Sequence, residues 1–265
     1  MSSLTSQTTL NDYLALFKLK LVKLWSLLFQ KSLFVIVILA IVILCLLIYG
    51  PQMWIRYVMK RHGAELNSLP GTGGELAMHL IKQFQIKGVE VEQTTPNSDH
   101  YDDADKKVRL SPSIYNGRSL TAIAVATHEV GHAIQFYRKE NITHLRKRYT
   151  PLARMIEKVS ISILFSIPLI TAIFKVPHAV LLTATVGVLG MFATVLVQLI
   201  VLPLEWDASF NKALPILKEG KYINQEQEAA VKSVLRAAAF TYVAAALADM
   251  LRLWRWLAIL RGAIR

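Results

Sequence analysis

Two histidines and a glutamate stand at the spacing of a catalytic metal site. The segment His128-Glu129-Val130-Gly131-His132 fits the pattern H-E-x-x-H. Residues i and i+4 lie on the same face of an α-helix, so both imidazoles can bind one ion. Glu129 lies beside them, where it can accept a proton from water at the metal. The segment therefore predicts zinc-dependent hydrolysis, with His128 and His132 as metal ligands and Glu129 as the catalytic residue.

The motif lies in a segment predicted to form a mostly buried helix, from about residue 119 to about residue 138. Apolar residues occupy much of its circumference: Ile123, Val125, Ala126, Val130, Ala133, Ile134 and Phe136. Uncompensated polar groups in such a helix are costly, so the two histidines and the glutamate need partners. A metal ion would satisfy all three. The alternative is a pair of core histidines hydrogen-bonded to backbone groups.

Residues 51–157 hold the main polar block, in which we expect an α+β domain built around this helix. Apolar residues at helical spacing predict a further helix over residues 75–84. Alternation predicts a strand over 88–92, and residues 100–101 and 108–110 flank a turn-rich segment typical of a hairpin. A strand beside the site could hold a substrate in extended form, and residues 108–110 are the candidate.

Long apolar runs predict a chain that crosses the membrane several times. The 265 residues are 54% hydrophobic, with a mean hydropathy of +0.40. A helix needs roughly 20 apolar residues to cross a bilayer. We expect one spanning helix over residues 32–50 and a hairpin of two over residues 158–204. Residues 236–265 hold either a further span or an interfacial helix, with a basic tail, and residues 1–31 form an amphipathic basic lead-in.

The formal charge of +12 comes from basic residues spread along the segments that flank these runs. No nucleic-acid motif accompanies them, so the charge indicates contact with anionic lipid headgroups and no nucleic-acid partner. The positive-inside rule favours a cytoplasmic zinc domain in a multi-pass protein of the cell (inner) membrane. A single cysteine, Cys45, excludes an internal disulfide.

A catalytic zinc normally takes three protein ligands and leaves one position open. A short H-E-x-x-H-x-x-G-x-x-H continuation is absent, because Gln135 and Arg138 stand at its last two positions. Glu205 is the candidate third ligand. It follows the third apolar run, and the two spans before it return the chain to the membrane face that His132 left. The alternative for Glu205 is an ion pair with a basic residue near the membrane. We expect one Zn²⁺ per chain, in a third-ligand helix region over residues 205–235.

Several stretches together resemble one family. They are residues 99–102, 108–111, 124–135 around the motif, 202–209 and 237–247. In these stretches the chain resembles the YugP-type membrane zinc metallopeptidases, a gluzincin-like family of neutral zinc peptidases. The resemblance implies a membrane-bound peptidase with an N-terminal span, a membrane-proximal zinc domain and further spans near the C-terminus. It also implies His128, His132 and Glu205 as ligands and Glu129 as catalytic residue. The lead-in before residue 31 looks longer than that family requires.

A more distant resemblance is to membrane gluzincins of the heat-shock and prenyl-protein-processing type, whose third-ligand motif is E-x-x-x-D. In this chain Ser209 stands at the fourth position after Glu205, while Asp207 lies two residues on. Asp207 could orient a histidine ring from a different angle, or cap the helix that follows. An oxyanion donor is also needed. The candidates are Tyr242, His100, Tyr101 and Tyr115.

The sequence therefore predicts a mainly α, polytopic membrane protein with a small membrane-proximal α+β zincin-like metallopeptidase domain. The predicted activity is that of a zinc metalloendopeptidase that hydrolyses membrane or membrane-associated proteins. The competing class is a catalytically inactive zinc-binding membrane scaffold or adaptor. Glu129 favours the enzyme, because a structural zinc site needs no general base. A transporter fits poorly, since ionisable residues stand only near the ends of the apolar runs.

Overall fold

The computed structural model describes residues 49–174 and 177–244, together with residues 25, 30–31, 34–43, 45–46 and 247. Most of the predicted lead-in over 1–31 and most of the segment 236–265 lie outside the described residues. The chain divides into two compact units, residues 1–47 and 48–265. In the first unit, Phe34–Ile43 is a short apolar helix inside the predicted span over 32–50.

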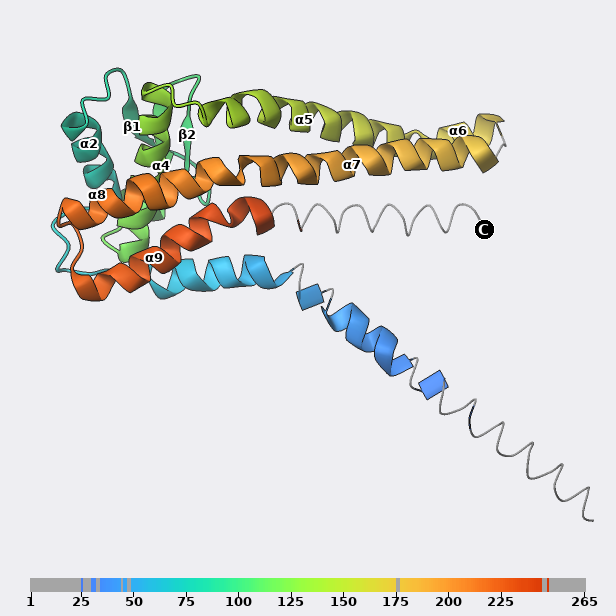
Figure 1. Cartoon of the computed structure of the whole chain (residues 1–265), viewed down its shortest axis with the longest axis horizontal. Coiled ribbons are helices and arrows are strands. Elements are labelled where there is room, and N and C mark those ends of the chain that lie inside the picture. The colour runs from blue at the N-terminus through green and yellow to red at the C-terminus, as the bar shows by residue number, and fades with distance from the viewer. Residues whose placement is uncertain are drawn as a thin grey trace, which may run out of the picture. The chain divides into compact units, whose positions relative to one another are not determined.

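The second unit is mainly helical and carries one small sheet, as the sequence predicted. Residues 49–61 are helical. The elements that follow are α2 Gly73–Gln83, β1 Glu90–Gln93, β2 His100–Asp102, β3 Lys107–Leu110, α3 Pro112–Tyr115, α4 Leu120–Tyr137, α5 Thr143–Phe165, α6 Ile167–Phe174, α7 Pro177–Trp206, the π-helix η1 Asp207–Ala213, α8 Leu214–Glu219 and α9 Gln225–Ala239. Figure 1 shows their arrangement.

Local sequence signals define several helix starts. Helix α2 begins with a capping box in which the Thr72 side chain accepts from the Glu75 N–H and the Glu75 side chain accepts from the Thr72 N–H. Helix α9 begins with the same arrangement between Asn224 and Gln227. Helix α4 begins at Ser119, whose hydroxyl accepts the Ala122 N–H at 3.0 Å. The predicted helix over residues 119–138 is thereby confirmed.

The sheet has the order β1-β3-β2. Strand β2 pairs antiparallel with β3, which confirms the predicted hairpin, and β1 pairs parallel with β3 over Glu90–Gln93. Strand β3 is therefore central, and both of its edges are hydrogen-bonded. The prediction that residues 108–110 take a substrate by strand addition is wrong, because no free edge remains there. Alternation along one strand does not reveal which strands lie beside it, so the sequence pattern missed this.

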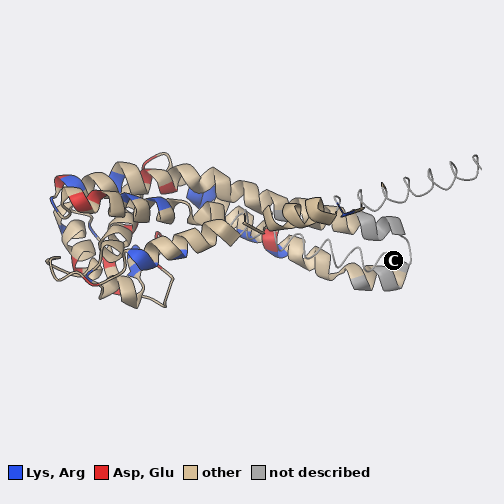
Figure 2. Ribbon diagram, turned by 90° about the horizontal axis from the view of Figure 1, so that it is seen from below, with Lys and Arg blue, Asp and Glu red and all other residues tan. Residues whose placement is uncertain are grey.

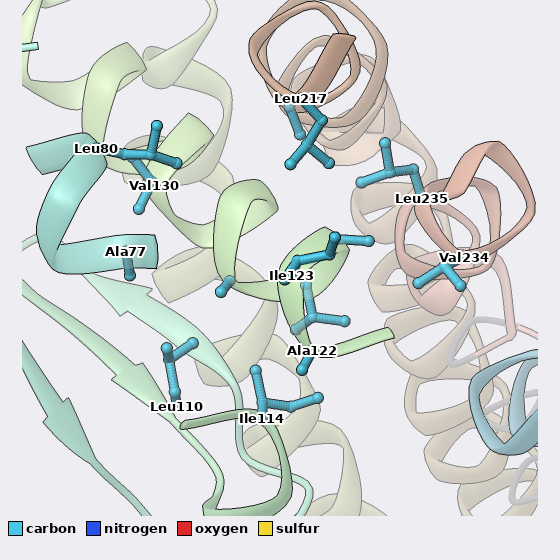
Figure 3. Packing of buried hydrophobic residues seen from close by; sticks show 14 of the residues in the cluster. Ala77, Leu80, Leu110, Ile114, Ala122, Ile123, Val130, Leu217, Val234 and Leu235 are labelled. Atoms are coloured by element: carbon cyan, nitrogen blue, oxygen red, sulfur yellow. The ribbon is translucent and has the colours of Figure 1, made fainter. Parts of the chain in front are cut away.

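Helix α4 forms the centre of the core, and every residue from Leu120 to Phe136 is buried. Figure 3 shows Ala77 and Leu80 of α2 packed on one side of it. Leu217 of α8, with Val234 and Leu235 of α9, packs on another. These side chains are almost fully buried, so α4 is held on several faces at once. A helix fixed in this way can position polar side chains with little freedom.

Helices α5 and α6 follow one another and run antiparallel to α7, with α5 packed along α7 (Figure 1). These three helices are called the helix pair below. The sequences of α6 and α7 contain one charged residue, Glu205, and Figure 2 shows the charged residues concentrated around the sheet and the short helices. Large apolar side chains of the pair are exposed, including Phe165 at 68% and Leu189 at 61%. By length and composition, Leu182–Glu219 is the one helix among the described residues that could cross a membrane.

Candidate metal centre

Helix α4 and the end of α7 bring three predicted ligands together. Glu205 Oε2 lies 3.3 Å from His128 Nε2 and 3.2 Å from His132 Nε2. The two imidazole rings of α4 meet edge to face with their centroids 4.7 Å apart. All three side chains are buried, at 2–3% exposure, and one ligand atom from each lies within 4.8 Å of the others. This is the geometry of a site for one metal ion.

The carboxylate of Glu205 is incompletely satisfied. Its Oε1 atom is buried without a hydrogen-bond partner among the described residues. An unpaired buried carboxylate oxygen is costly, so its place next to two imidazoles fits the donor set of a metal ion. Burial alone would lower the pKa of His132, but the adjacent Glu205 carboxylate outweighs burial and raises that pKa. A proton and a metal ion therefore compete for the same position.

The outer nitrogens of both rings have hydrogen-bond acceptors. Ser209 Oγ lies 3.0 Å from His128 Nδ1 and donates its own proton to the Leu235 carbonyl at 3.2 Å. It must therefore accept from His128 Nδ1–H. Ser209 is fully buried, so no water competes for this bond.

Gln135 does the same for the second histidine. Its Oε1 lies 2.9 Å from His132 Nδ1, while its Nε2 donates to the Leu204 carbonyl at 3.1 Å and to Asp207 Oδ2 at 2.7 Å. Both rings thus carry a proton on Nδ1, and in the neutral form of each ring the Nε2 lone pair faces Glu205 Oε2. Three lone-pair atoms at this separation repel one another unless a cation lies between them, so the donor set fits zinc.

Asp207 does not contact a histidine. It accepts from Gln135, from Asn211 at 2.8 Å and from Lys212 at 3.1 Å, so it acts on His132 only through Gln135. The chain is continuously helical from α7 into η1, so Asp207 does not cap a helix either. Sequence reasoning missed Ser209 and Gln135 as partners of the rings. Ser209 stands at the fourth position after Glu205, and that spacing was the available signal.

Close approach of two helices depends on Gly131. A Cβ atom at this position would lie 2.9 Å from the Ala208 carbonyl oxygen and 3.3 Å from Lys212 Cβ. The neighbour is η1, a π-helix in which a wider turn shifts the residues after Glu205. The missing side chain allows η1 to approach α4 closely enough for Ser209 to reach His128. The glycine in the motif therefore has a packing role.

A cavity of about 420 Å³ opens beside the three ligands and is lined by Glu129 and Asp99. Glu129 follows His128 in α4 and is 6% exposed, which places a carboxylate next to the metal position. Asp99 accepts from the Ser111 N–H at 2.6 Å and from the Ser111 hydroxyl at 3.1 Å. Burial raises the pKa of Asp99 despite these two bonds. The cavity thus holds the buried Glu129 carboxylate beside the three candidate metal ligands.

Two of the four candidates for an oxyanion donor lie at the cavity. His100 and Tyr242 line the cavity, whereas Tyr101 and Tyr115 do not. His100 points its Nδ1 at the Ser98 carbonyl, 2.8 Å away, so its Nε2 is free to face the cavity.

A buried helix with H-E-x-x-H, a glutamate from a second helix and a further carboxylate on an adjacent cavity form a candidate metal centre of the zinc-peptidase class. The comparisons agree with this class. The family described as "Putative neutral zinc metallopeptidase" matches residues 36–261. The chain is also 33% identical over 215 residues to "Putative membrane protease YugP" of Bacillus subtilis (strain 168), covering 79% of this chain and 92% of that protein. The chain belongs to this family of neutral zinc metallopeptidases, which confirms the resemblance. No solved structure matches it.

Proposed function

We propose that this chain is a membrane-embedded zinc metalloendopeptidase that binds one Zn²⁺ through His128, His132 and Glu205. The observation that carries the proposal is the buried carboxylate of Glu205, which faces two Nε2 lone pairs and keeps one oxygen unpartnered. Glu129 on the adjacent cavity supplies the catalytic group that a structural zinc site would not need.

Zinc, when bound, supplies a Lewis acid that polarises the peptide carbonyl and makes water more acidic. Glu129 accepts the proton of the attacking water and delivers it to the leaving amine. Ser209 and Gln135 keep both imidazoles in the tautomer that binds metal. His100 and Tyr242 line the cavity and are the candidates to donate a hydrogen bond to the developing oxyanion.

The membrane position follows from the helix pair. Glu205 stands near the C-terminal end of α7, directly after an apolar stretch long enough to cross a bilayer. The exposed apolar side chains of α5, α6 and α7 need lipid contact to be stable. We therefore place the site at a membrane face of a multi-pass protein, where membrane proteins or their exposed loops would be the substrates.

The basic cluster Arg146-Lys147-Arg148 near the start of α5 favours a cytoplasmic zinc domain at the cell membrane. A Glu226→Cys substitution, at an exposed position near the start of α9 and in a Cys45→Ala background, tests this orientation. The new thiol should react with a membrane-impermeant reagent only after the cells are broken. Labelling of intact cells would reverse the orientation.

We propose β2, in place of β3, as the strand that pairs with a substrate. Strand β2 pairs with no second strand among the described residues, and residues Asn97, Asp99 and His100 at its start line the cavity. An extended peptide could pair with this edge. Peptides N-methylated at single backbone amides should then lose affinity at alternate positions, because alternate amides face the edge. Equal tolerance at every position would exclude strand pairing.

The test of the proposed activity is cleavage of a proteome-derived peptide library by the full chain in detergent, with zinc bound. Glu129→Gln should retain zinc and lose roughly 100- to 10,000-fold in rate. A chelator should abolish cleavage and added zinc should restore it. Zinc-loaded wild-type protein that cleaves nothing would favour the alternative, an inactive zinc-binding scaffold, and equal cleavage by Glu129→Gln would indicate a contaminating peptidase.

A further inference from the structure

One cation lines the cavity among the described residues: Arg146, from the first turns of α5. Every other ionisable group on that surface is acidic, a histidine or a tyrosine, and the acidic groups are Asp99, Glu129 and Glu205. Glu205 is committed to the metal position, and Glu129 is committed to the proton of the attacking water. Neither metal binding nor proton transfer by Glu129 therefore uses the guanidinium.

The side chain of Arg146 is held in place. One terminal nitrogen donates to the Tyr101 carbonyl at 3.3 Å, and the guanidinium carbon lies 6.0 Å from the ring centroid of Phe136 on α4. The arginine thus connects α5 to strand β2 and to the helix that carries the histidines. Such a side chain is pre-organised, so little conformational entropy is lost when it binds a ligand.

The guanidinium also lacks an ion-pair partner. In the described part of the chain no carboxylate pairs with Arg146, although Arg109 on β3 pairs with Glu92, Asp102 and Asp105. Burial opposes the charge of Arg146, but nearby acidic groups, first Tyr242 and then Glu205 and Glu129, raise its pKa above the ordinary value. A partly buried guanidinium without a carboxylate partner keeps hydrogen-bonding capacity that an anionic ligand can use.

The Arg146 guanidinium lies next to the edge of β2 at which a substrate is proposed to pair. The cavity runs along residues Asn97, Asp99 and His100 but not along Tyr101, whose carbonyl is already occupied by Arg146. A peptide that follows β2 would therefore meet the guanidinium at the end of the accessible edge. The remaining N–H groups of Arg146 are free to bind a planar anion there.

We propose that Arg146 binds a carboxylate of the substrate and is a specificity-determining residue of this site. The inference rests on the proposed peptidase function and names the class of peptide that it selects. The carboxylate comes either from an acidic side chain or from the C-terminus of the substrate. Both have the planar geometry that a guanidinium binds through two hydrogen bonds.

The experiment measures peptide affinity with the zinc-loaded full chain in detergent, in a Glu129→Gln background that prevents turnover. Three N-acetylated, alanine-based hexapeptides serve as probes: one with a free C-terminal carboxylate, one amidated with a single aspartate, and one amidated without acid. One of the acidic peptides should bind about 10- to 100-fold more tightly than the neutral one, the range expected for charge-assisted hydrogen bonds. The peptide that gains affinity identifies the source of the carboxylate.

Adding Arg146→Gln should remove that preference and leave the affinity for the neutral peptide unchanged. Arg146→Lys, which keeps the charge but loses the fork, should retain part of it. Arg148→Gln is the matched control, because Arg148 is exposed on the same helix and does not line the cavity. Zinc content checks that each variant is folded.

Equal affinity for all three peptides, an equal loss for all three in Arg146→Gln, or binding of none would overturn the proposal. An equal loss would instead assign Arg146 to the backbone or the oxyanion. The result is separable from the peptidase proposal. If the acidic preference holds while the wild type cleaves nothing, the proposed activity fails and the carboxylate site stands. If cleavage occurs without acidic preference, the reverse is true.

Discussion

Two groups of ionisable side chains show opposite ways of holding charge. On the sheet surface, Arg109 pairs with Glu92 at 2.7 Å and with Asp105 at 2.6 Å, and it also contacts Asp102. Lys107 adds a bond of 2.6 Å to Glu92. Every carboxylate in this surface cluster has a cationic partner within the chain, and all its members are partly exposed.

The buried cluster of His128, His132 and Glu205 differs in composition and in balance. It contains two neutral rings and one carboxylate, at 2–3% exposure, and one oxygen of Glu205 has no partner among the described residues. Exposed ion pairs contribute little, whereas an uncompensated buried charge is costly. The chain thus satisfies its own charges on the surface and leaves an acceptor open where a metal fits.

The largest expected effect is the loss of metal from Glu205→Ala, with Glu92→Ala of the surface cluster as matched control. Removing one of three ligands should eliminate most bound zinc, whereas removing a surface carboxylate should leave about one zinc per chain. Metal content of protein purified in detergent without chelator measures both. Zinc retained by Glu205→Ala would mean that another residue is the third ligand. Zinc absent from the wild type even after reconstitution would favour a site without metal.

The second expected effect concerns the bond that orients His128. Ser209→Ala removes the acceptor of His128 Nδ1–H and leaves the Leu235 carbonyl without its donor. Loss of such a partner typically costs 10- to 100-fold in metal affinity, roughly. Competition with a zinc-buffering chelator measures the change. Ser162→Ala is the control, since that exposed hydroxyl donates to the Lys158 carbonyl of the same helix and lies outside the metal centre. Equal affinities for the two variants would show that Ser209 does not position the ring.

The sequence predicted the parts of the site that depend on local spacing. His128 and His132 are one helical turn apart, and burial of α4 follows from its apolar circumference. Glu205 could be placed because two apolar runs return the chain to the same face. These features need only the period of a helix and the length of a span.

The parts that depend on packing could not be predicted. Ser209 reaches His128 only because η1 is a π-helix and Gly131 lets it approach, and neither is visible in the apolar pattern. Gln135 hydrogen-bonds both Asp207 and His132, so the aspartate contacts the histidine ring only through Gln135. The central place of β3 likewise depends on a parallel pairing with β1, which no local signal encodes.

The third prediction tests that packing. Gly131→Ala should improve the intrinsic helix propensity of α4 by about 1 kcal/mol. The new Cβ would however lie 2.9 Å from the Ala208 carbonyl oxygen. Overpacking of this kind costs roughly 1–3 kcal/mol, so the net change should be destabilising. Gly50→Ala is the control, because a Cβ there has nothing within 4 Å and should be neutral or stabilising. Thermal unfolding in detergent measures both. Equal shifts for the two variants would show that α4 and η1 can separate without cost.

The smallest expected effect is the acid response of the surface cluster. Hydrogen bonds from Lys107 and Arg109 lower the pKa of Glu92 below its ordinary value of 4.5. Because the pKa is lower in the folded chain than in the unfolded chain, Glu92 contributes its full stabilisation above pH 4.5. That contribution is lost as the pH falls through the folded pKa. The difference in unfolding free energy between wild type and Glu92→Gln should therefore be constant above this pH and shrink below it. Salt should reduce the difference at neutral pH.

Unfolding midpoints of wild type and Glu92→Gln, measured across this acid range, compare the surface cluster with the metal centre. Glu219→Gln, at an exposed position, is the control. The surface cluster should lose a small, salt-sensitive increment in strongly acidic solution. The metal centre should instead respond at higher pH, because protons displace zinc from His132, whose pKa is raised by Glu205. Metal release and the surface contribution should thus occur in separate pH ranges. A single transition common to both, unchanged by Glu92→Gln, would mean that the surface pairs contribute nothing measurable and that the acid response belongs to the metal centre alone.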